Sequence, residues 1–216
     1  MALRELEKLK SALVLVPPEG QFSLNLDPAE VARYLREPEL MKTGEGLPQI
    51  TSVRDQVVVV VGPKIVFEDR SDVIPPAASR LPDVVNGFVQ IFRRQGLERY
   101  RAYGWNFDVA FDAPGEEPAA SLIANSFLDA RVLSDRAGIH PVGAGVRMFF
   151  EQSEARCDLR LESRHRDLNT PRFFAHINYH YELDPPGSPP DLDNLRVAYH
   201  GLWGSFVDLL TKLVKP

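Results

Sequence analysis

The sequence predicts an α+β protein in which helices pack on one face of an antiparallel sheet. Three observations lead to this prediction: strands that alternate apolar and polar residues, helices that open on proline-containing caps, and hairpins that join strands in direct succession. The clearest alternation lies between Phe173 and Leu183. Odd-numbered residues there are apolar or aromatic and most even-numbered ones are polar, so the two faces of this strand differ in character.

The first half of the chain predicts the βαββαβ element order of a ferredoxin-like unit. Its first helix is marked by Asp27 as N-cap and Pro28 at the first helical position, and its second helix ends at Gly96. The expected elements are a strand over 12–16, a helix from Pro28, a loop over 38–48, a hairpin of strands 50–61 and 64–69 around Gly62-Pro63, a helix from Pro82, and a strand over 105–111.

The second half partly repeats this order, which favours an internal duplication. Its expected elements after strand 105–111 are a helix over 118–129, strands over 142–151, 155–163 and 173–183, and a last helix from its N-cap Asp191 to about Val214. We therefore expect a single domain over residues 1–216, divisible into two fused pseudo-repeats of about 12–100 and 101–214.

Composition narrows the classes of function that the protein can have. The net charge of −5 argues against non-specific nucleic-acid binding, which needs a basic surface. The single cysteine, Cys157, excludes an intramolecular disulfide, and its place on an apolar strand face predicts a buried side chain. The first residues lack a secretory apolar segment and no run is long enough to span a bilayer, so we expect no membrane association and a cytoplasmic location.

Polar side chains gather on one face of the last three expected strands. With a two-residue turn at 152–153, Arg147 lies opposite Asp158, and a compatible register places Arg156 opposite Glu182. That register also pairs Asp158 with His180 and Glu162 with His176. The candidate ligand-binding residues on this face are Arg147, Arg156, Asp158, Arg160, His176, Asn178, His180 and Glu182.

Phe149 interrupts this polar face, where the alternation predicts a hydrophilic residue. An exposed aromatic residue near Arg147 and Arg156 has the composition of an interface centre. It predicts contact with another protein, most simply with a second copy in a two-fold homodimer. The alternative is that Phe149 packs under the loop 164–172 or under a terminus of its own chain.

Spacing argues against a metal site and against catalysis. His176 and His180 are four residues apart on one strand, roughly 13 Å, which is too far for two ligands of one zinc. His180 and Glu182 are close enough at about 7 Å but need a third ligand from elsewhere. The sequence has no phosphate-binding loop, nucleophile elbow or His-Glu-x-x-His motif, so we expect no cofactor and name no catalytic residue.

Two classes of function follow from these observations. The first is a non-catalytic binding or assembly protein that uses the polar and aromatic face of the sheet. The alternative is an enzyme or binding protein for a small anionic ligand, with its site at His176, Asn178, His180, Arg156 and Arg160.

Three patterns together resemble a group of functionally uncharacterised bacterial proteins. They are the valine-rich hairpin ending in Val61-Gly62-Pro63, the aromatic alternation near residue 179, and the pattern Leu-x-x-Leu-x-x-x-Tyr-His-x-Leu-Trp-x-x-Phe that begins at Leu192. The resemblance implies no activity and assigns no site residues.

Overall fold

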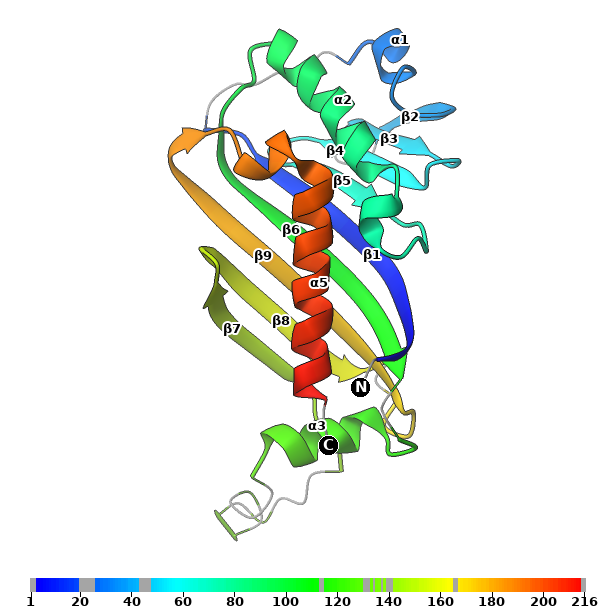
Figure 1. Cartoon of the computed structure of the whole chain (residues 1–216), viewed down its shortest axis with the longest axis vertical. Coiled ribbons are helices and arrows are strands. Elements are labelled where there is room, and N and C mark those ends of the chain that lie inside the picture. The colour runs from blue at the N-terminus through cyan, green and yellow to red at the C-terminus, as the bar shows by residue number, and fades with distance from the viewer. Residues whose placement is uncertain are drawn as a thin grey trace.

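The computed structural model describes residues 3–19, 26–42, 48–112, 115–129, 133, 135–136, 138, 142–164 and 167–214. Within them, nine antiparallel strands form one sheet in the order β2-β3-β4-β5-β1-β6-β9-β8-β7 (Figure 1). The strands are β1 Arg4–Val16, β2 Pro38–Lys42, β3 Pro48–Ser52, β4 Val57–Val61, β5 Ile65–Asp69, β6 Tyr100–Asp112, β7 Val146–Gln152, β8 Ala155–Ser163 and β9 Arg172–Gly187.

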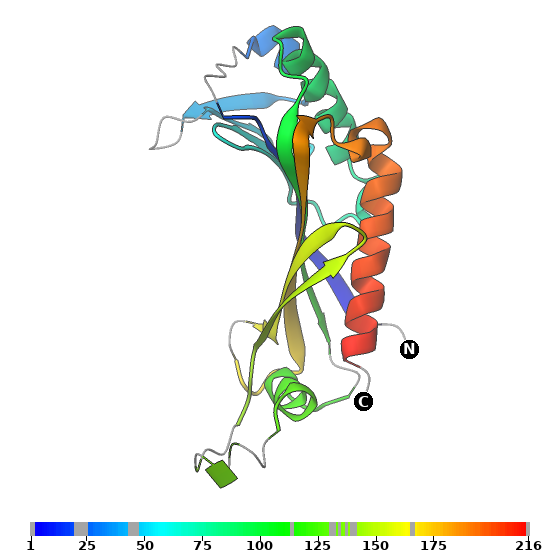
Figure 2. The same ribbon diagram turned by 90° about the vertical axis from the view of Figure 1, so that its left-hand side faces the viewer.

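The two long helices lie on the same side of this sheet, as Figure 2 shows. The helical elements are α1 Pro28–Val31, η1 Pro76–Ala78, α2 Leu81–Arg94, α3 Ala119–Phe127, η3 Pro190–Asp193 and α5 Leu195–Leu213. None of the helices in the described ranges is long and apolar enough to cross a membrane. The predicted mixture of helices with a large antiparallel sheet is confirmed. The ferredoxin-like order of the first half is not confirmed, because β2 to β5 place four strands between α1 and α2.

The core lies between the central strands and α5. Trp105 and Phe107 of β6 stack on Tyr199 of α5, with ring centroids 4.9 and 5.7 Å away, and Phe107 also lies 6.1 Å from Phe206. All four side chains are fully buried. Aromatic residues bury about 150–250 Å² each, so this cluster holds α5 against β6 and leaves the even-numbered residues of β6 and β9 on the opposite side of the sheet.

Several element boundaries differ from the predicted ones. β1 begins at Arg4 rather than at Ala12, and the expected loop 38–48 contains β2; residues 43–47 of that loop lie outside the described residues. The expected strand 50–61 is divided into β3 and β4, because Asp55 accepts hydrogen bonds from the Ser52 hydroxyl (3.1 Å) and the Arg36 amide (2.8 Å) and stabilises a turn between them.

The start of the last helix also differs. Asp191 was expected to cap it, but its Oδ2 accepts a hydrogen bond from the indole Nε1 of Trp105 at 2.7 Å. α5 instead begins after Asn194, whose side chain makes no capping hydrogen bond. The partly buried carboxyl of Asp191 has a raised pKa, because burial disfavours its charge more than the Trp105 hydrogen bond favours it.

The predicted strand registers are wrong by two residues. The β7–β8 turn is formed by Ser153 and Glu154, both at positive φ, which sets Arg147 opposite Arg160. In the next pair, Arg156 lies opposite His180 rather than opposite Glu182. A shift of two residues keeps every side chain on its predicted face, because alternation has a period of two. Alternation therefore could not distinguish the two registers.

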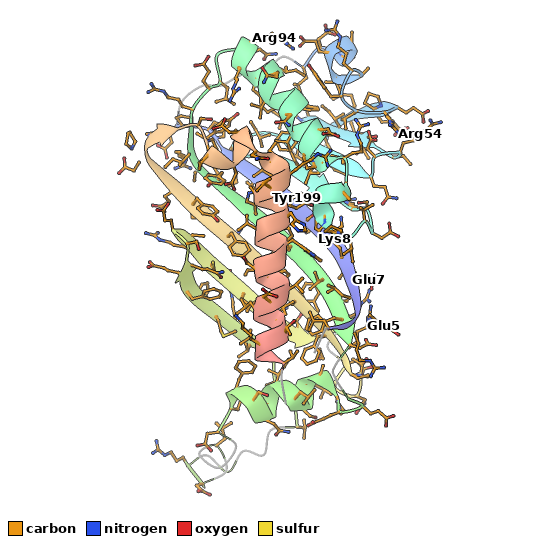
Figure 3. All side chains as sticks on the ribbon, viewed as in Figure 1. Glu5, Glu7, Lys8, Arg54, Arg94 and Tyr199 are labelled. Carbon is orange, nitrogen blue, oxygen red and sulfur yellow. The ribbon has the colours of Figure 1, made fainter. Side chains whose placement is uncertain are left out.

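One buried ion pair was not foreseen. Lys8 of β1 is only 2% exposed, and its Nζ lies 2.8 Å from Asp69 Oδ2 and 3.3 Å from the Ser71 hydroxyl. Nearby, the hydroxyls of Ser11 and Tyr199 share a hydrogen bond under α5 (Figure 3). Burial lowers the pKa of Lys8, and the hydrogen bond to Asp69 opposes that shift. Breaking a buried pair of this kind by removing one partner is strongly destabilising.

The assignment of strand faces can be tested by placing a charge in the core. Leu159→Asp and Tyr179→Asp should each unfold the protein or cost on the order of 4 kcal/mol of unfolding free energy, because both positions are at most 1% exposed. Urea denaturation followed by circular dichroism measures the change. Val53→Asp, at a position 69% exposed, is the control and should melt like the parent. A Leu159 variant as stable as this control would mean that the two faces are exchanged.

Candidate functional site

The structure brings all eight candidate ligand-binding residues onto one side of the sheet. This side, which we call the open face, carries the even-numbered residues of β6, β8 and β9 and the odd-numbered residues of β7; it lies opposite α2 and α5 (Figure 2). Its cross-strand rows are Asp108-His176-Arg160-Arg147, Asn106-Asn178-Asp158-Phe149 and Gly104-His180-Arg156-Glu151.

Arg147 and Asp158 form a two-pronged ion pair. Arg147 Nε and Nη2 donate to the two carboxylate oxygens of Asp158 at 2.9 and 2.6 Å. These hydrogen bonds lower the pKa of Asp158. The guanidinium of Arg147 also lies 4.8 Å from the ring centroid of Phe149. The predicted pairing of Arg147 with Asp158 is therefore present, although it runs diagonally across the strands.

The other arginines of the open face are paired in the same way. Arg156 Nη1 donates to Glu182 Oε1 at 3.2 Å, which His180 Nε2 approaches to 3.8 Å. Arg160 Nη2 donates to Glu162 at 2.8 Å. The expected pairs of Asp158 with His180 and of Glu162 with His176 are not formed. Asp158 bonds to Arg147 instead, and Glu162 bonds to Arg160, two residues before it on the same strand.

His176 has a partner that sequence reasoning missed. Its Nδ1 donates to Asp108 Oδ1 at 2.5 Å, and Lys10 Nζ lies 3.2 Å from the other oxygen. Partial burial acts to raise the pKa of Asp108, but the His176 hydrogen bond and the charge of Lys10 outweigh it, so the net shift is downward. The alternation of Asp108 with Trp105 and Phe107 is the sequence signal that places it on this face.

The centre of the open face is neutral. Asn178 Nδ2 donates to Asn106 Oδ1 at 2.7 Å, so two side-chain amides from neighbouring strands satisfy each other between the charged rows. Beside them, Phe149 is 71% exposed. The described parts of loop 164–172 and of the two termini therefore leave Phe149 exposed, which argues against the alternative that it packs within its own chain.

Several hollows open on the described part of this face, two of them over β7 and β8. One, of about 490 Å³, is lined by polar groups of Arg147, Asp158, Arg160, Glu162 and His176. The other, of about 430 Å³, is lined by Phe149, Arg156, Asn178 and His180 among others. Every arginine in these linings already has a carboxylate partner. An anionic ligand would therefore have to compete with the protein's own acids for the guanidinium groups.

The site offers few groups for nucleophilic or metal chemistry. Cys157 is 2% exposed, and burial raises the pKa of its thiol to about 11, which keeps it protonated at neutral pH. In the part of the chain that the structure describes, no three side chains of His, Cys, Asp or Glu form a group able to hold a metal ion. The two histidines of the open face contact different acids: His176 lies against Asp108, and His180 lies near Glu182.

Fold and site together define an α+β protein with a large antiparallel sheet that is uncovered on a polar face. No family model matches the sequence, and no curated protein matches it. Among solved structures, the chain is similar to Methanococcus jannaschii TBP, with 9% sequence identity, a TM-score of 0.33, and coverage of 98% of this chain and 99% of that one. A likeness at this level carries no inference about function.

Metal binding can be tested by melting. We expect zinc, nickel and a chelator to leave the melting temperature unchanged, since a metal that binds only the folded state would raise it by mass action. Differential scanning fluorimetry with each additive provides the measurement. A metal-dependent rise that disappears in His180→Ala would contradict the argument from strand spacing.

The two perturbed aspartates predict opposite pH effects on stability. Asp108 has a lowered pKa in the folded state, so its contribution is present above the unfolded value near 3.9 and is lost as pH falls through the folded pKa. Asp108→Asn should therefore cost about 1–2 kcal/mol at pH 7, the worth of a charged hydrogen bond, and progressively less below about pH 4. Urea melts between pH 3 and pH 7 provide the measurement.

Asp191→Asn is the matched control for this experiment. The folded-state pKa of Asp191 is raised, so folding is less favourable with this carboxyl ionised than with it protonated, and the parent becomes relatively more stable as the group protonates. The stability of the parent relative to this variant should therefore rise as pH falls. Equal pH profiles for the two variants would show that these side chains do not titrate as described.

Proposed function

We propose that this is a non-catalytic binding protein that associates with another protein chain through the open face around β7, β8 and β9, most simply as a homodimer. The observation that carries the proposal is Phe149, which is 71% exposed among charged exposed side chains of the open face, those of Arg147, Glu151, Arg156 and Arg160. Isolated aromatic residues with a neighbouring arginine are typical of the centres of protein interfaces.

The charge balance of the open face also supports an interface with protein. Arg147, Arg156 and Arg160 each pair with an acid of this face, so most of its charge can be covered without being left unpaired; Glu151 is the exception among the described residues. Such pairs contribute little to stability while exposed. In an interface, such ion pairs determine the orientation of the partner more than they increase the affinity.

A second candidate function is binding or conversion of a small anionic molecule. The hollow of about 490 Å³ favours it, since Arg147, Arg160 and His176 line one side together. In this alternative an anion displaces Glu162 or Asp158 from its arginine. The first proposal is preferred because no arginine of this lining is free of a carboxylate partner in the structure.

We also propose that the chain contains two pseudo-repeats in one domain. In each half a long strand, β1 or β6, is followed by a short helix, a run of successive strands and a long helix, and the two long strands pair at the centre of the sheet. The cytoplasmic location and the ferredoxin-like relationship of the first half stay predictions.

Sedimentation velocity tests the proposed assembly. At on the order of 50 μM, the parent should sediment as a dimer and Phe149→Glu should sediment mainly as a monomer, because the substitution places an unpaired charge in the interface. Val197→Glu is the matched control, since Val197 is 65% exposed on α5, on the other side of the sheet. This control should remain dimeric.

The result can also contradict the proposal. A parent that is monomeric at every concentration up to about 500 μM would exclude the homodimer. A Phe149→Glu variant that dimerises like the parent would place the interface elsewhere. Binding of an anionic compound that Arg160→Ala abolishes, together with a monomeric parent, would favour the second candidate function.

A further inference from the structure

β7 is an edge strand whose outer side is free. In the described residues it pairs only with β8, and Figure 1 shows it at the margin of the sheet, away from α5. An edge strand presents backbone N–H and C=O groups that can pair with another strand. Natural edges are commonly protected by charged side chains, especially lysine, by proline or by a β-bulge. β7 has no lysine or proline and no register shift against β8, and its two charged residues, Arg147 and Glu151, are opposite in sign.

The β7–β8 turn decides which backbone groups are free. Ser153 and Glu154 have φ of 48° and 68°, as a type I′ turn requires, so Gln152 and Ala155 exchange hydrogen bonds across it. Hydrogen-bonded positions alternate along an antiparallel strand. The even-numbered residues of β7 therefore bond to β8, and the odd-numbered Arg147, Phe149 and Glu151 direct their N–H and C=O groups outward.

We propose that β7 pairs antiparallel with β7 of a second copy of this chain, about a two-fold axis at Phe149, to form one continuous sheet across the dimer. This inference rests on the proposed self-association at Phe149 and deepens it: contact runs along the β7 edge of the open face, and the rest of that face stays uncovered. It places Phe149 opposite Phe149 of the partner subunit, and Arg147 opposite Glu151 of the partner subunit. Each of these residue pairs exchanges two backbone hydrogen bonds, because all of the residues involved are outward-facing.

The side chains of β7 match each other in this register. Arg147 and Glu151 lie two residues either side of Phe149, so the two-fold axis sets opposite charges against each other on both sides of the aromatic pair. Glu151 is exposed and has no ion-pair partner in the described part of the chain, so it is free to make this contact. On the opposite side of the sheet, Met148 faces Phe150 of the partner subunit, which continues the apolar surface.

Other two-fold registers are less favourable. Centring the axis on Met148 or Phe150 sets Phe149 opposite a charged residue and loses the pairing of Arg147 with Glu151. Centring it on Arg147 sets two arginines opposite each other, and centring it on Glu151 sets two glutamates opposite each other. Like charges directly opposite destabilise a strand pair. The other edge strand, β2, is shorter and begins with Pro38, which cannot donate a backbone hydrogen bond. Among the described edges, β7 is therefore the one suited to pairing with itself.

Amide hydrogen exchange tests this geometry on the unmodified protein. Residue-resolved exchange by NMR should show the amides of Phe149 and Glu151 slowing as the concentration rises, by about tenfold where nine-tenths of the chains are dimeric. The amides of Met148 and Phe150 are internal controls, because they already bond to β8 and should be protected equally at all concentrations.

This readout separates the geometry from the proposed function. If the chain dimerises and Phe149→Glu prevents it, but the amides of Phe149 and Glu151 exchange at a rate independent of concentration, association occurs through the open face and the edge pairing is wrong. If the chain does not associate at any concentration, both are wrong.

Charge exchange tests the register. Glu151→Lys sets lysine opposite Arg147 and should weaken self-association about tenfold or more, and Arg147→Glu should weaken it similarly. A mixture of these two variants should restore dimerisation, because each chain then opposes the complementary charges of the other. Glu154→Lys is the matched control: it makes the same charge change in the turn, outside the paired residues, and should dimerise like the parent. A mixture that stays monomeric would overturn the register.

Discussion

The structure depends on the packing of α5 against β6 and β9. The rings of Trp105, Phe107, Tyr199 and Phe206 lie between helix and sheet without exposure to solvent. Because successive residues of a strand point to opposite sides, fixing these residues inward also fixes the even-numbered residues of β6 and β9 on the open face. The side of the sheet on which Asp108 and every candidate site residue of β9 lie therefore follows from this packing contact, and the β6–β9 register then sets Asp108 opposite His176.

The electrostatic character of the open face depends on how its charged side chains pair with each other. Arg147, Arg156 and Arg160 each have a carboxylate partner from the same face, and His176 has Asp108, which Lys10 also approaches. A face with this balance has no strong preference for an anion, and the exposed Phe149 is the exception within it. These properties are the basis for proposing a protein partner rather than a small charged ligand, and the proposed pairing at the outer edge of β7 would orient that partner.

The two sides of the central strand β1 make different contacts. On the helix side, β1 contributes Lys8 to a buried ion pair with Asp69, and Ser11 to a hydrogen bond with Tyr199 of α5. On the open side, its Lys10 reaches Asp108 of β6. The N-terminal strand therefore joins the first half of the sheet, the last helix and the candidate site. The two halves of the chain depend on each other through this strand.

The sequence by itself determined the faces. Alternation in β8 and β9 separated the buried residues, such as Leu159 and Tyr179, from the polar ones, and the proline-marked helix starts near Pro28 and Leu81 were recognisable from local preferences. The tertiary structure alone decided the registers, the partner of His176 and the role of Asp191. A shift of two residues preserves alternation, so only the turn at Ser153 and Glu154 could set the β7–β8 register. Asp191 has the residue type and position of a helix N-cap, but it accepts a hydrogen bond from Trp105, 86 residues away in the sequence. A buried indole N–H needs an acceptor, and only the folded chain brings this one to it.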